Sequence, residues 1–139
     1  MGDFIPVNTP SLSGNEARYL QECIDTGWIS SEGPFVRRFE EASASAAQRV
    51  HGISVTNGTA ALEAAVAALR LGPGDEVIMP TFTIISCAGA VVKPGAVPVL
   101  VDADPETWTM DISKLEGALT KRTRAIMPVH IYGLPVDMD

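Results

Sequence analysis

The segment from Val55 to Leu62 joins a short β-branched run, an Asn-Gly turn and the start of an alanine-rich stretch. A strand, turn and helix of this kind leave the first backbone N–H groups of the helix without partners and give them a partial positive charge. Gly58 has no side chain to obstruct an approaching ligand, and Thr59 can act as N-cap or donate its hydroxyl to an anion. The segment fits a phosphate site, and it also fits an ordinary capped turn without a ligand.

The glycine pattern around this turn narrows the choice of phosphate ligand. No Gly-Lys-Ser/Thr follows Gly58, as a P-loop requires, and the three-glycine dinucleotide fingerprint is absent from the sequence. ATP and NAD are therefore not expected as ligands.

Two other groups of residues could take part in acid–base chemistry. Asp102 and Asp104 follow an apolar run and precede Pro105, a pattern that favours capping of a turn over a catalytic acid pair. His130 ends the last apolar run, where it either orients a substrate or satisfies a buried hydrogen bond, and the second role is favoured. No catalytic residue is assigned to the chain.

Composition bounds the class of protein. A chain of 139 residues with 46% apolar and 19% charged residues is typical of one globular domain, taken here as 1–139. The net charge of −7 without a basic cluster argues against nucleic-acid and membrane partners. Cys23 and Cys87 lack metal-ligand spacing and are expected to be reduced, buried thiols, so no metal site is predicted. No targeting or membrane-spanning pattern is found, which predicts a cytoplasmic protein.

Helical and strand patterns alternate along the chain after an amino-terminal part, 1–34, of extended arm, helix and loop. The α/β part, 35–139, has short strands that are apolar on both sides, as expected of parallel strands covered by helices. We therefore predict a three-layer α/β/α fold with a mostly parallel sheet. The predicted helices are 15–26, 35–50, 60–71, 84–92 and 112–119, and the predicted strands are 53–56, 76–79, 97–101 and 125–129.

Ligands of such sheets bind beyond the carboxyl ends of the strands. Four segments follow the predicted strands, and they hold polar and aromatic residues: 57–59, 80–83, 102–104 and 130–133. We expect them to converge on one edge of the sheet.

Six ordered blocks carry a family resemblance that covers the chain from about Ile5 to its last residue. They are Trp28-Ile-Ser-Ser-x-Gly, Asn57-Gly-Thr-Ala-Ala-Leu, Gly72-Pro-Gly-Asp-Glu-Val-Ile, Pro80-Thr-Phe-Thr, Gly95-Ala-x-Pro-Val-x-Val-Asp102 and Pro128-Val-His-x-Tyr-Gly133. Together they resemble the DegT/DnrJ/EryC1/StrS nucleotide-sugar aminotransferases, a family of fold-type-I pyridoxal phosphate enzymes. The resemblance implies the amino-terminal portion of the aspartate aminotransferase-like large domain.

The same resemblance implies a reaction and a set of partners. Members transfer an amino group from glutamate to a nucleotide-linked keto sugar, and the pattern here is most similar to members that act on a 4-keto-6-deoxy sugar. Pyridoxal phosphate would be the cofactor of the complete enzyme. The family also implies a homodimer, or higher self-association, with active sites at the subunit interface.

Site residues follow from the matching blocks. Gly58, Thr59 and Ala60 would hold the cofactor phosphate, and Ile84 stands where the family commonly has an aromatic residue stacked on the pyridine ring. Phe82 could compensate, although packing in the core is favoured for it.

The block that begins at Trp28 would bring Ser30 and Ser31 to the substrate. Alternatively, Trp28 and Ile29 pack in the dimer interface, and one loop can do both.

The family places its cofactor lysine and the acid that protonates the pyridine nitrogen after the His-x-Tyr-Gly block, and this chain ends at Asp139. Lys93, Lys114 and Lys121 do not match the lysine motif. In the family the first strand also lies apart from the next three, so 53–56 would be an orphan strand. We therefore expect an amino-terminal piece that is inactive alone. A sugar dehydratase of the same fold, with histidine in place of the lysine, and a non-catalytic phosphate-binding or partner-binding module remain alternatives.

Overall fold

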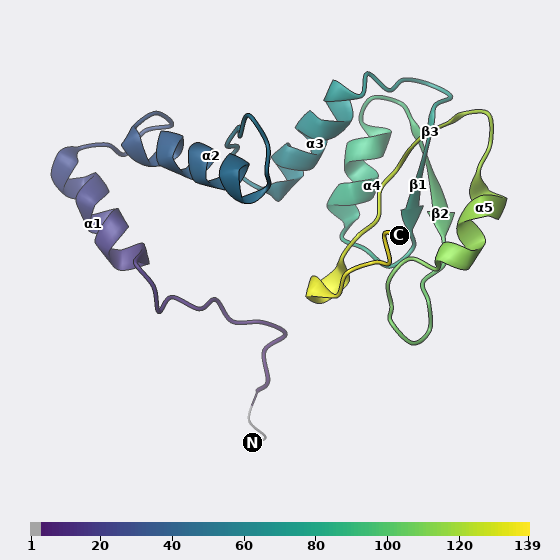
Figure 1. Cartoon of the computed structure of the whole chain (residues 1–139), viewed down its shortest axis with the longest axis horizontal. Coiled ribbons are helices and arrows are strands. Elements are labelled where there is room, and N and C mark those ends of the chain that lie inside the picture. The colour runs from purple at the N-terminus through teal and green to yellow at the C-terminus, as the bar shows by residue number, and fades with distance from the viewer. Residues whose placement is uncertain (1–3) are drawn as a thin grey trace. The chain divides into compact units, whose positions relative to one another are not determined.

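The computed structural model describes residues 4–139, which form a first unit ending at Ser54 and a second unit, Val55–Asp139. The first unit holds helices α1 (Glu16–Thr26) and α2 (Pro34–Ala46) (Figure 1). Helix α1 ends at Thr26 and is capped by Gly27, whose φ of 75° only glycine adopts freely and whose N–H donates to the Ile24 carbonyl. Helix α2 is shorter than the predicted 35–50, because Gln48 has a φ of 54° that no helix continues through.

The predicted strand at 53–56 is wrong. The backbone N–H and the hydroxyl of Ser54 both donate to Glu40 Oε1 at 2.9 Å, and the Ser54 N–H lowers the pKa of the Glu40 carboxyl. A strand requires a backbone partner along a neighbouring strand, and here a side chain takes that place. The segment is irregular, although its β-branched residues favour a strand.

The second unit contains a parallel sheet of three strands in the order β2-β1-β3. In chain order the unit consists of α3 (Gly58–Ala68), β1 (Glu76–Pro80), α4 (Ile85–Val92), β2 (Val97–Val101), the 3₁₀ turn η1 (Ile112–Lys114), α5 (Leu115–Ala118), β3 (Thr123–Ile126) and the 3₁₀ turn η2 (Ile131–Gly133). The sheet pairs Ile78 of β1 with Val99 of β2 and with Ile126 of β3. The predicted strand at 97–101 is confirmed residue for residue, while the strand predicted at 125–129 lies at 123–126.

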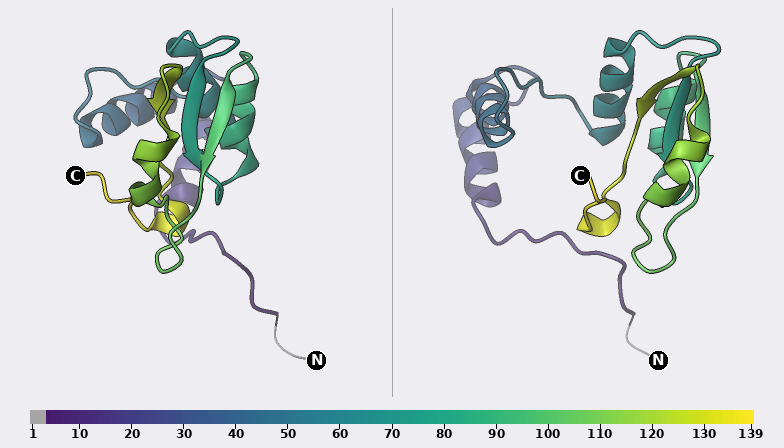
Figure 2. Two further views of the ribbon diagram at one scale, coloured as in Figure 1. Left: turned by 90° about the vertical axis from the view of Figure 1, so that its right-hand side faces the viewer. Right: turned by 45° about the vertical axis from the view of Figure 1, so that its right-hand side comes forward.

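Helices cover the sheet on both faces, which confirms the α/β/α arrangement at the scale of these strands (Figure 2). Val77 packs with Val91 of α4 and with Ala96, whereas its neighbour Ile78 packs on the opposite face with Val101 and Met110. Successive side chains of a strand point to opposite faces, so β1 contributes to both cores. All five residues of β1 are buried, as expected of the central strand of a layered sheet.

A buried carboxylate joins the start of β1 to the loop before β3. Glu76 is 4% exposed and accepts hydrogen bonds from the Thr120 hydroxyl and from Arg122 Nε, the latter at 2.7 Å. The Thr120 hydrogen bond, with the Arg122 charge in support, lowers the pKa of the Glu76 carboxyl. The charged form of Glu76 is therefore favoured by folding.

Replacing Glu76 with glutamine should lower the free energy of unfolding at neutral pH. The free energy of unfolding of the variant should also fall less as the pH is lowered. A depressed folded pKa contributes stability above the ordinary carboxyl pKa, and this contribution disappears as pH falls through the folded value. Urea unfolding at neutral and acidic pH measures the effect, with exposed Glu106→Gln as the matched control. Equal losses at both pH values, or an equal loss in the control, would contradict this role of Glu76.

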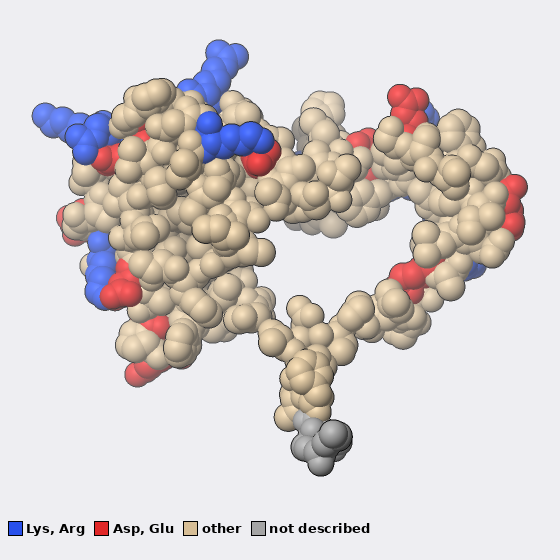
Figure 3. Space-filling model, turned by 180° about the vertical axis from the view of Figure 1, so that it is seen from behind, with Lys and Arg blue, Asp and Glu red and all other residues tan. Residues whose placement is uncertain are grey.

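Charges elsewhere on the second unit are distributed in small pairs. Lys93 pairs with Glu63, Arg124 with Asp75 and Lys114 with Asp111, and Figure 3 shows several Lys and Arg side chains directly beside Asp or Glu. Within residues 4–139, no helix is long and apolar enough to cross a membrane, and no group of three metal-ligating side chains gathers. Of the two cysteines, Cys87 is buried as predicted, while Cys23 is only half-buried; both are free thiols.

Candidate functional site

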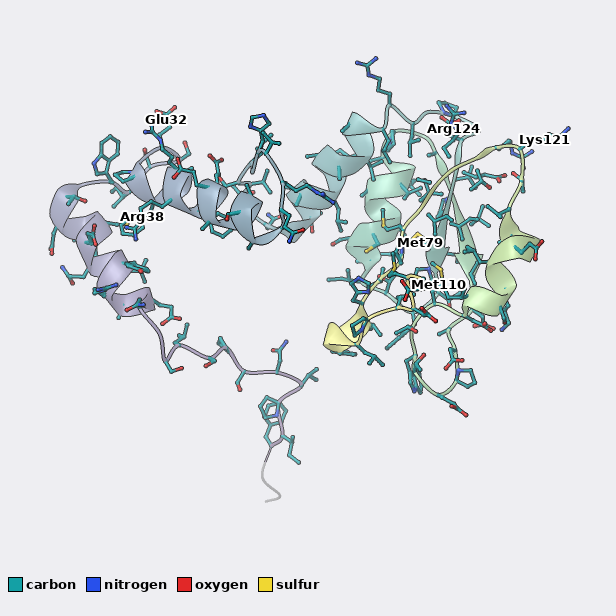
Figure 4. All side chains as sticks on the ribbon, viewed as in Figure 1. Glu32, Arg38, Met79, Met110, Lys121 and Arg124 are labelled. Atoms are coloured by element: carbon teal, nitrogen blue, oxygen red, sulfur yellow. The ribbon has the colours of Figure 1, made fainter. Side chains whose placement is uncertain are left out.

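The carboxyl ends of the strands lie at one end of the sheet, together with the segments that follow them (Figure 1). The ladder is extended there by the N–H of Thr81, which donates to the Val101 carbonyl, and by that of Met127, which donates to the Ile78 carbonyl. Lys121 and Arg124 lie at the opposite end of the sheet from Met110 (Figure 4). The segments that follow β1, β2 and β3 thus lie at one edge of the sheet, as predicted, whereas 57–59 follows no strand and leads into α3.

Helix α3 begins at this edge with two backbone donors available. Asn57 is the N-cap, since its backbone is extended and its Oδ1 accepts the N–H of Ala60 at 2.9 Å, while its carbonyl accepts the N–H of Ala61. The N–H groups of Gly58 and Thr59 donate to no other described residue. Thr59 is therefore not the N-cap, a role predicted as one of its two alternatives, because the longer Asn57 side chain already fills the cap position.

Space in front of the helix start is open. A Cβ placed on Gly58 would meet no described atom within 4 Å, and both Gly58 and Thr59 are exposed. An anion could thus reach both free N–H groups and the partial positive charge of the helix start. The N–H of Ala60, the third residue predicted for the phosphate site, already donates to the Asn57 side chain.

A second helix start lies beside the first. The hydroxyl of Thr59 is 2.9 Å from that of Ser86, the second residue of α4. Two hydroxyls and two helix amino termini therefore meet at one place. Ser86 was not predicted as a site residue, although its position near the start of the helix predicted at 84–92 was a usable signal.

Aromatic side chains gather at the same edge. The ring of Phe82 lies 5.4 Å from that of Trp108 and 6.4 Å from that of Tyr132, centroid to centroid. Phe82 is not a core residue, contrary to the favoured prediction, because its ring packs on two exposed rings and remains 37% exposed. Trp108 was missed from the sequence, where nothing in the local pattern links it to Phe82.

Ile84 immediately precedes α4 and has an extended backbone. Its side chain is 63% exposed, so it is free to contact a ligand at the edge. An aliphatic residue covers a ring by dispersion and lacks the aromatic term worth about 1 kcal/mol.

His130 holds the loop after β3 in shape. Its Nδ1 accepts the N–H of the buried Val136 at 3.0 Å, which places the ring proton of the neutral imidazole on Nε2. The favoured structural role of His130 is therefore present, although the residue as a whole is exposed.

The carboxylates near the edge serve local structure. Asp104 accepts the N–H groups of Thr107 and Glu106, and these bonds lower the pKa of its carboxyl. A hydrogen bond from the Ser113 hydroxyl likewise lowers the pKa of Asp111, and Asp111 raises that of Lys114. The two accepted N–H groups confirm the capping role predicted for Asp104, and a lowered carboxyl pKa is also the opposite of what a general acid at neutral pH needs.

Ser30 and Ser31 lie in the first unit, in the loop between α1 and α2. The Ser30 hydroxyl exchanges hydrogen bonds with the backbone of Glu32 at 3.2 Å. An open hollow of about 350 Å³ beside this loop is lined mainly by apolar residues, among them Leu20, Ile24, Trp28 and Phe35. Glu32 and Arg38 mark this part of the chain in Figure 4.

Comparison with known proteins gives a consistent result. Residues 10–139 match the model of the DegT/DnrJ/EryC1/StrS aminotransferase family. The chain is 53% identical over 135 residues to the GDP-perosamine synthase of Caulobacter vibrioides, which covers 97% of this chain and 36% of that protein.

Solved structures agree with the sequence matches. An aminotransferase from Psychrobacter cryohalolentis superposes with a TM-score of 0.83 at 35% identity, covering 91% of this chain and 32% of that one. NtdA from Bacillus subtilis with bound cofactor PMP superposes with a TM-score of 0.79 at 38% identity, covering 88% and 28%. The chain thus spans about a third of the length of the relatives it matches.

Proposed function

Because the chain belongs to the DegT/DnrJ/EryC1/StrS aminotransferase family, we propose that it supplies the cofactor-phosphate-binding part of a nucleotide-sugar aminotransferase. The amino donor is glutamate and the acceptor is a 4-keto-6-deoxy nucleotide sugar, in line with the similarity to a GDP-perosamine synthase. The enzyme works in the cytoplasm, and two copies form the active unit.

The start of α3 is the observation that carries this proposal. The N–H groups of Gly58 and Thr59 are free among the described residues, and no side chain at Gly58 blocks them. The Thr59 and Ser86 hydroxyls are 2.9 Å apart and can turn toward the same ligand. These donors fit the phosphate of pyridoxal phosphate, and related NtdA is known with the cofactor PMP.

Pyridoxal phosphate, when bound, supplies an electron sink for the transfer of an amino group. The residues of this chain hold and orient that group. Gly58 and Thr59 would bind the phosphate through their backbone, and Ile84, which immediately precedes α4, would cover a face of the ring. Ser30 and Ser31 bind the sugar substrate from the loop before α2.

The lysines of this chain do not serve the chemistry. Lys93 is paired with Glu63, and Lys114 is paired with Asp111 and Asp102. Lys121 lies in the loop before β3, away from the carboxyl edge (Figure 4). A pyridoxal phosphate aminotransferase needs a lysine as covalent anchor and general base, and we propose that polypeptide other than these residues provides it.

A chimaera tests the proposal. The isolated chain, given pyridoxal phosphate, glutamate and a 4-keto nucleotide sugar, should form no amino sugar. A chimaera in which the chain replaces the matching amino-terminal part of the Caulobacter vibrioides enzyme should form it, since the retained part brings the lysine.

The outcomes separate the candidate functions. Amino sugar formed by the isolated chain, or borohydride trapping of the cofactor on Lys93, Lys114 or Lys121, would overturn the assignment of the lysine. A folded chimaera that binds the cofactor and transfers no amino group would favour the non-catalytic phosphate-binding module. The ion pairs of Lys93 and Lys114 are the observation that supports this second candidate.

A further inference from the structure

Three aromatic rings from three different loops meet at the carboxyl edge of the sheet. Phe82 follows β1, Trp108 belongs to the loop after β2, and Tyr132 lies in η2 after β3. The rings of Trp108 and Tyr132 are inclined to that of Phe82 by 62° and 49°. Large parts of the outer rings remain open, since Trp108 is 58% and Tyr132 81% exposed.

The backbone holds both outer rings in an uncommon conformation. Trp108 has a φ of 62° and Tyr132 a φ of 50°, in the left-handed region that bulky residues rarely occupy. Such strain persists only where surrounding contacts enforce it, and it gathers at sites that clamp ligands. Two of the four non-glycine residues with positive φ in the described chain flank Phe82.

Specific hydrogen bonds enforce these two conformations. The N–H of Trp108 donates to the Asp104 carbonyl at 2.8 Å, and Ala103 bridges Met110 across the base of that loop. The N–H of Val136 donates to His130 Nδ1, which closes the loop that carries Tyr132. The aromatic face of Phe82, Trp108 and Tyr132 is thus built into the fold before any ligand arrives.

We propose that this aromatic face binds the planar base of the nucleotide-linked substrate. The inference rests on the proposed function, which requires a nucleotide sugar at this edge of the sheet. Bases stack on aromatic rings without needing a particular hydrogen-bond pattern. The exposed surface of three rings is large enough to cover one flat ligand and too small for a stable protein–protein interface. Ile84 remains for the cofactor ring, so the two flat groups have separate partners.

Trp108 itself reports on the proposed contact. The chain has two tryptophans, so Trp28→Phe leaves Trp108 as the sole indole. Guanosine diphosphate should quench the Trp108 emission saturably in this variant, whereas ribose phosphate, which lacks a base, should not. Tyr132→Ala should weaken the quenching titration at least about fivefold, as the loss of one stacking ring does, while Tyr132→Phe keeps the ring and the affinity.

Substitutions of His130 provide a second test that leaves all three rings of the aromatic face in place. His130→Ala should weaken binding of guanosine diphosphate by releasing the loop of Tyr132. His130→Asn, whose side-chain oxygen can accept the Val136 N–H in place of Nδ1, should restore it. Circular dichroism establishes that each variant is folded.

Several results would overturn the inference. Equal responses to guanosine diphosphate and ribose phosphate would show that only the sugar phosphate binds, and an unchanged titration in folded Tyr132→Ala would remove the base from this face. Quenching of Trp108 by pyridoxal phosphate, with guanosine diphosphate inert, would assign the rings to the cofactor. Failure of the proposed function is recognised separately by equilibrium dialysis. In that case the chain binds no pyridoxal phosphate, or binds it equally well after Gly58→Val.

Discussion

Valine in place of Gly58 should abolish binding of inorganic phosphate and pyridoxal phosphate while the chain stays folded. The new side chain would enter space that is empty in front of α3, so it meets no described atom within 4 Å. It would stand where the anion must lie to accept the N–H groups of Gly58 and Thr59. Hydrogen bonds to charged groups contribute about 1.5–3 kcal/mol each, so losing two should lower affinity by at least about a hundredfold.

The matched control is Gly117→Val in α5. That glycine is also helical, and a Cβ placed there likewise meets no described atom within 4 Å. Equilibrium dialysis gives the affinities, and thermal unfolding gives the stability, which should change by less than about 1 kcal/mol in either variant. Unchanged phosphate binding by Gly58→Val would move the anion site away from α3.

The isolated chain should self-associate, with a particle mass at least that of a dimer. In the described sheet, β2 and β3 each have one edge without a partner strand. Large apolar side chains are exposed along them, such as Leu100 at 58% and Ile126 at 43%. Open strand edges pair readily with another chain, and exposed apolar surface is buried when they do.

A charge on the edge should weaken this association. Leu100→Lys places an ammonium on the exposed side of β2, a device by which natural sheets discourage pairing. Light scattering across a dilution series measures the mass of both proteins. The prediction would be contradicted if the unsubstituted chain were a monomer at every dilution and unfolded cooperatively.

Much of the second unit could be predicted because its local signals and its packing agree. The turn at Gly72–Asp75 has the sequence of a tight turn, and in the structure Asp75 accepts the N–H of Gly72 while Gly74 adopts a φ of 90°. The apolar runs on either side of α4 became β1 and β2 because helices cover both faces. The free N–H groups of Gly58 and Thr59 could be predicted for the same reason, since a helix start has the same free donors in any fold.

Other features depend on contacts that a sequence window does not contain. Residues 53–56 have strand composition, yet the side chain of Glu40 took the hydrogen bond of Ser54. The helix predicted at 112–119 begins as the 3₁₀ turn η1, where Asp111 accepts the N–H of Ser113, and continues as the short helix α5. The contact of Phe82 with Trp108 depends on a loop with positive φ at a tryptophan, which no propensity predicts.

The role of the α3 start is tested most directly by an amide NMR titration of the chain with pyridoxine phosphate, which has the phosphate of the cofactor and no aldehyde to react with lysines. We expect saturable shifts that are largest at the N–H groups of Gly58 and Thr59, smaller at Ala60, whose N–H already donates to Asn57, and lost in Gly58→Val. Shifts centred elsewhere in the chain, with Gly58 and Thr59 unchanged at saturation, would contradict the assignment of the cofactor phosphate to the start of α3.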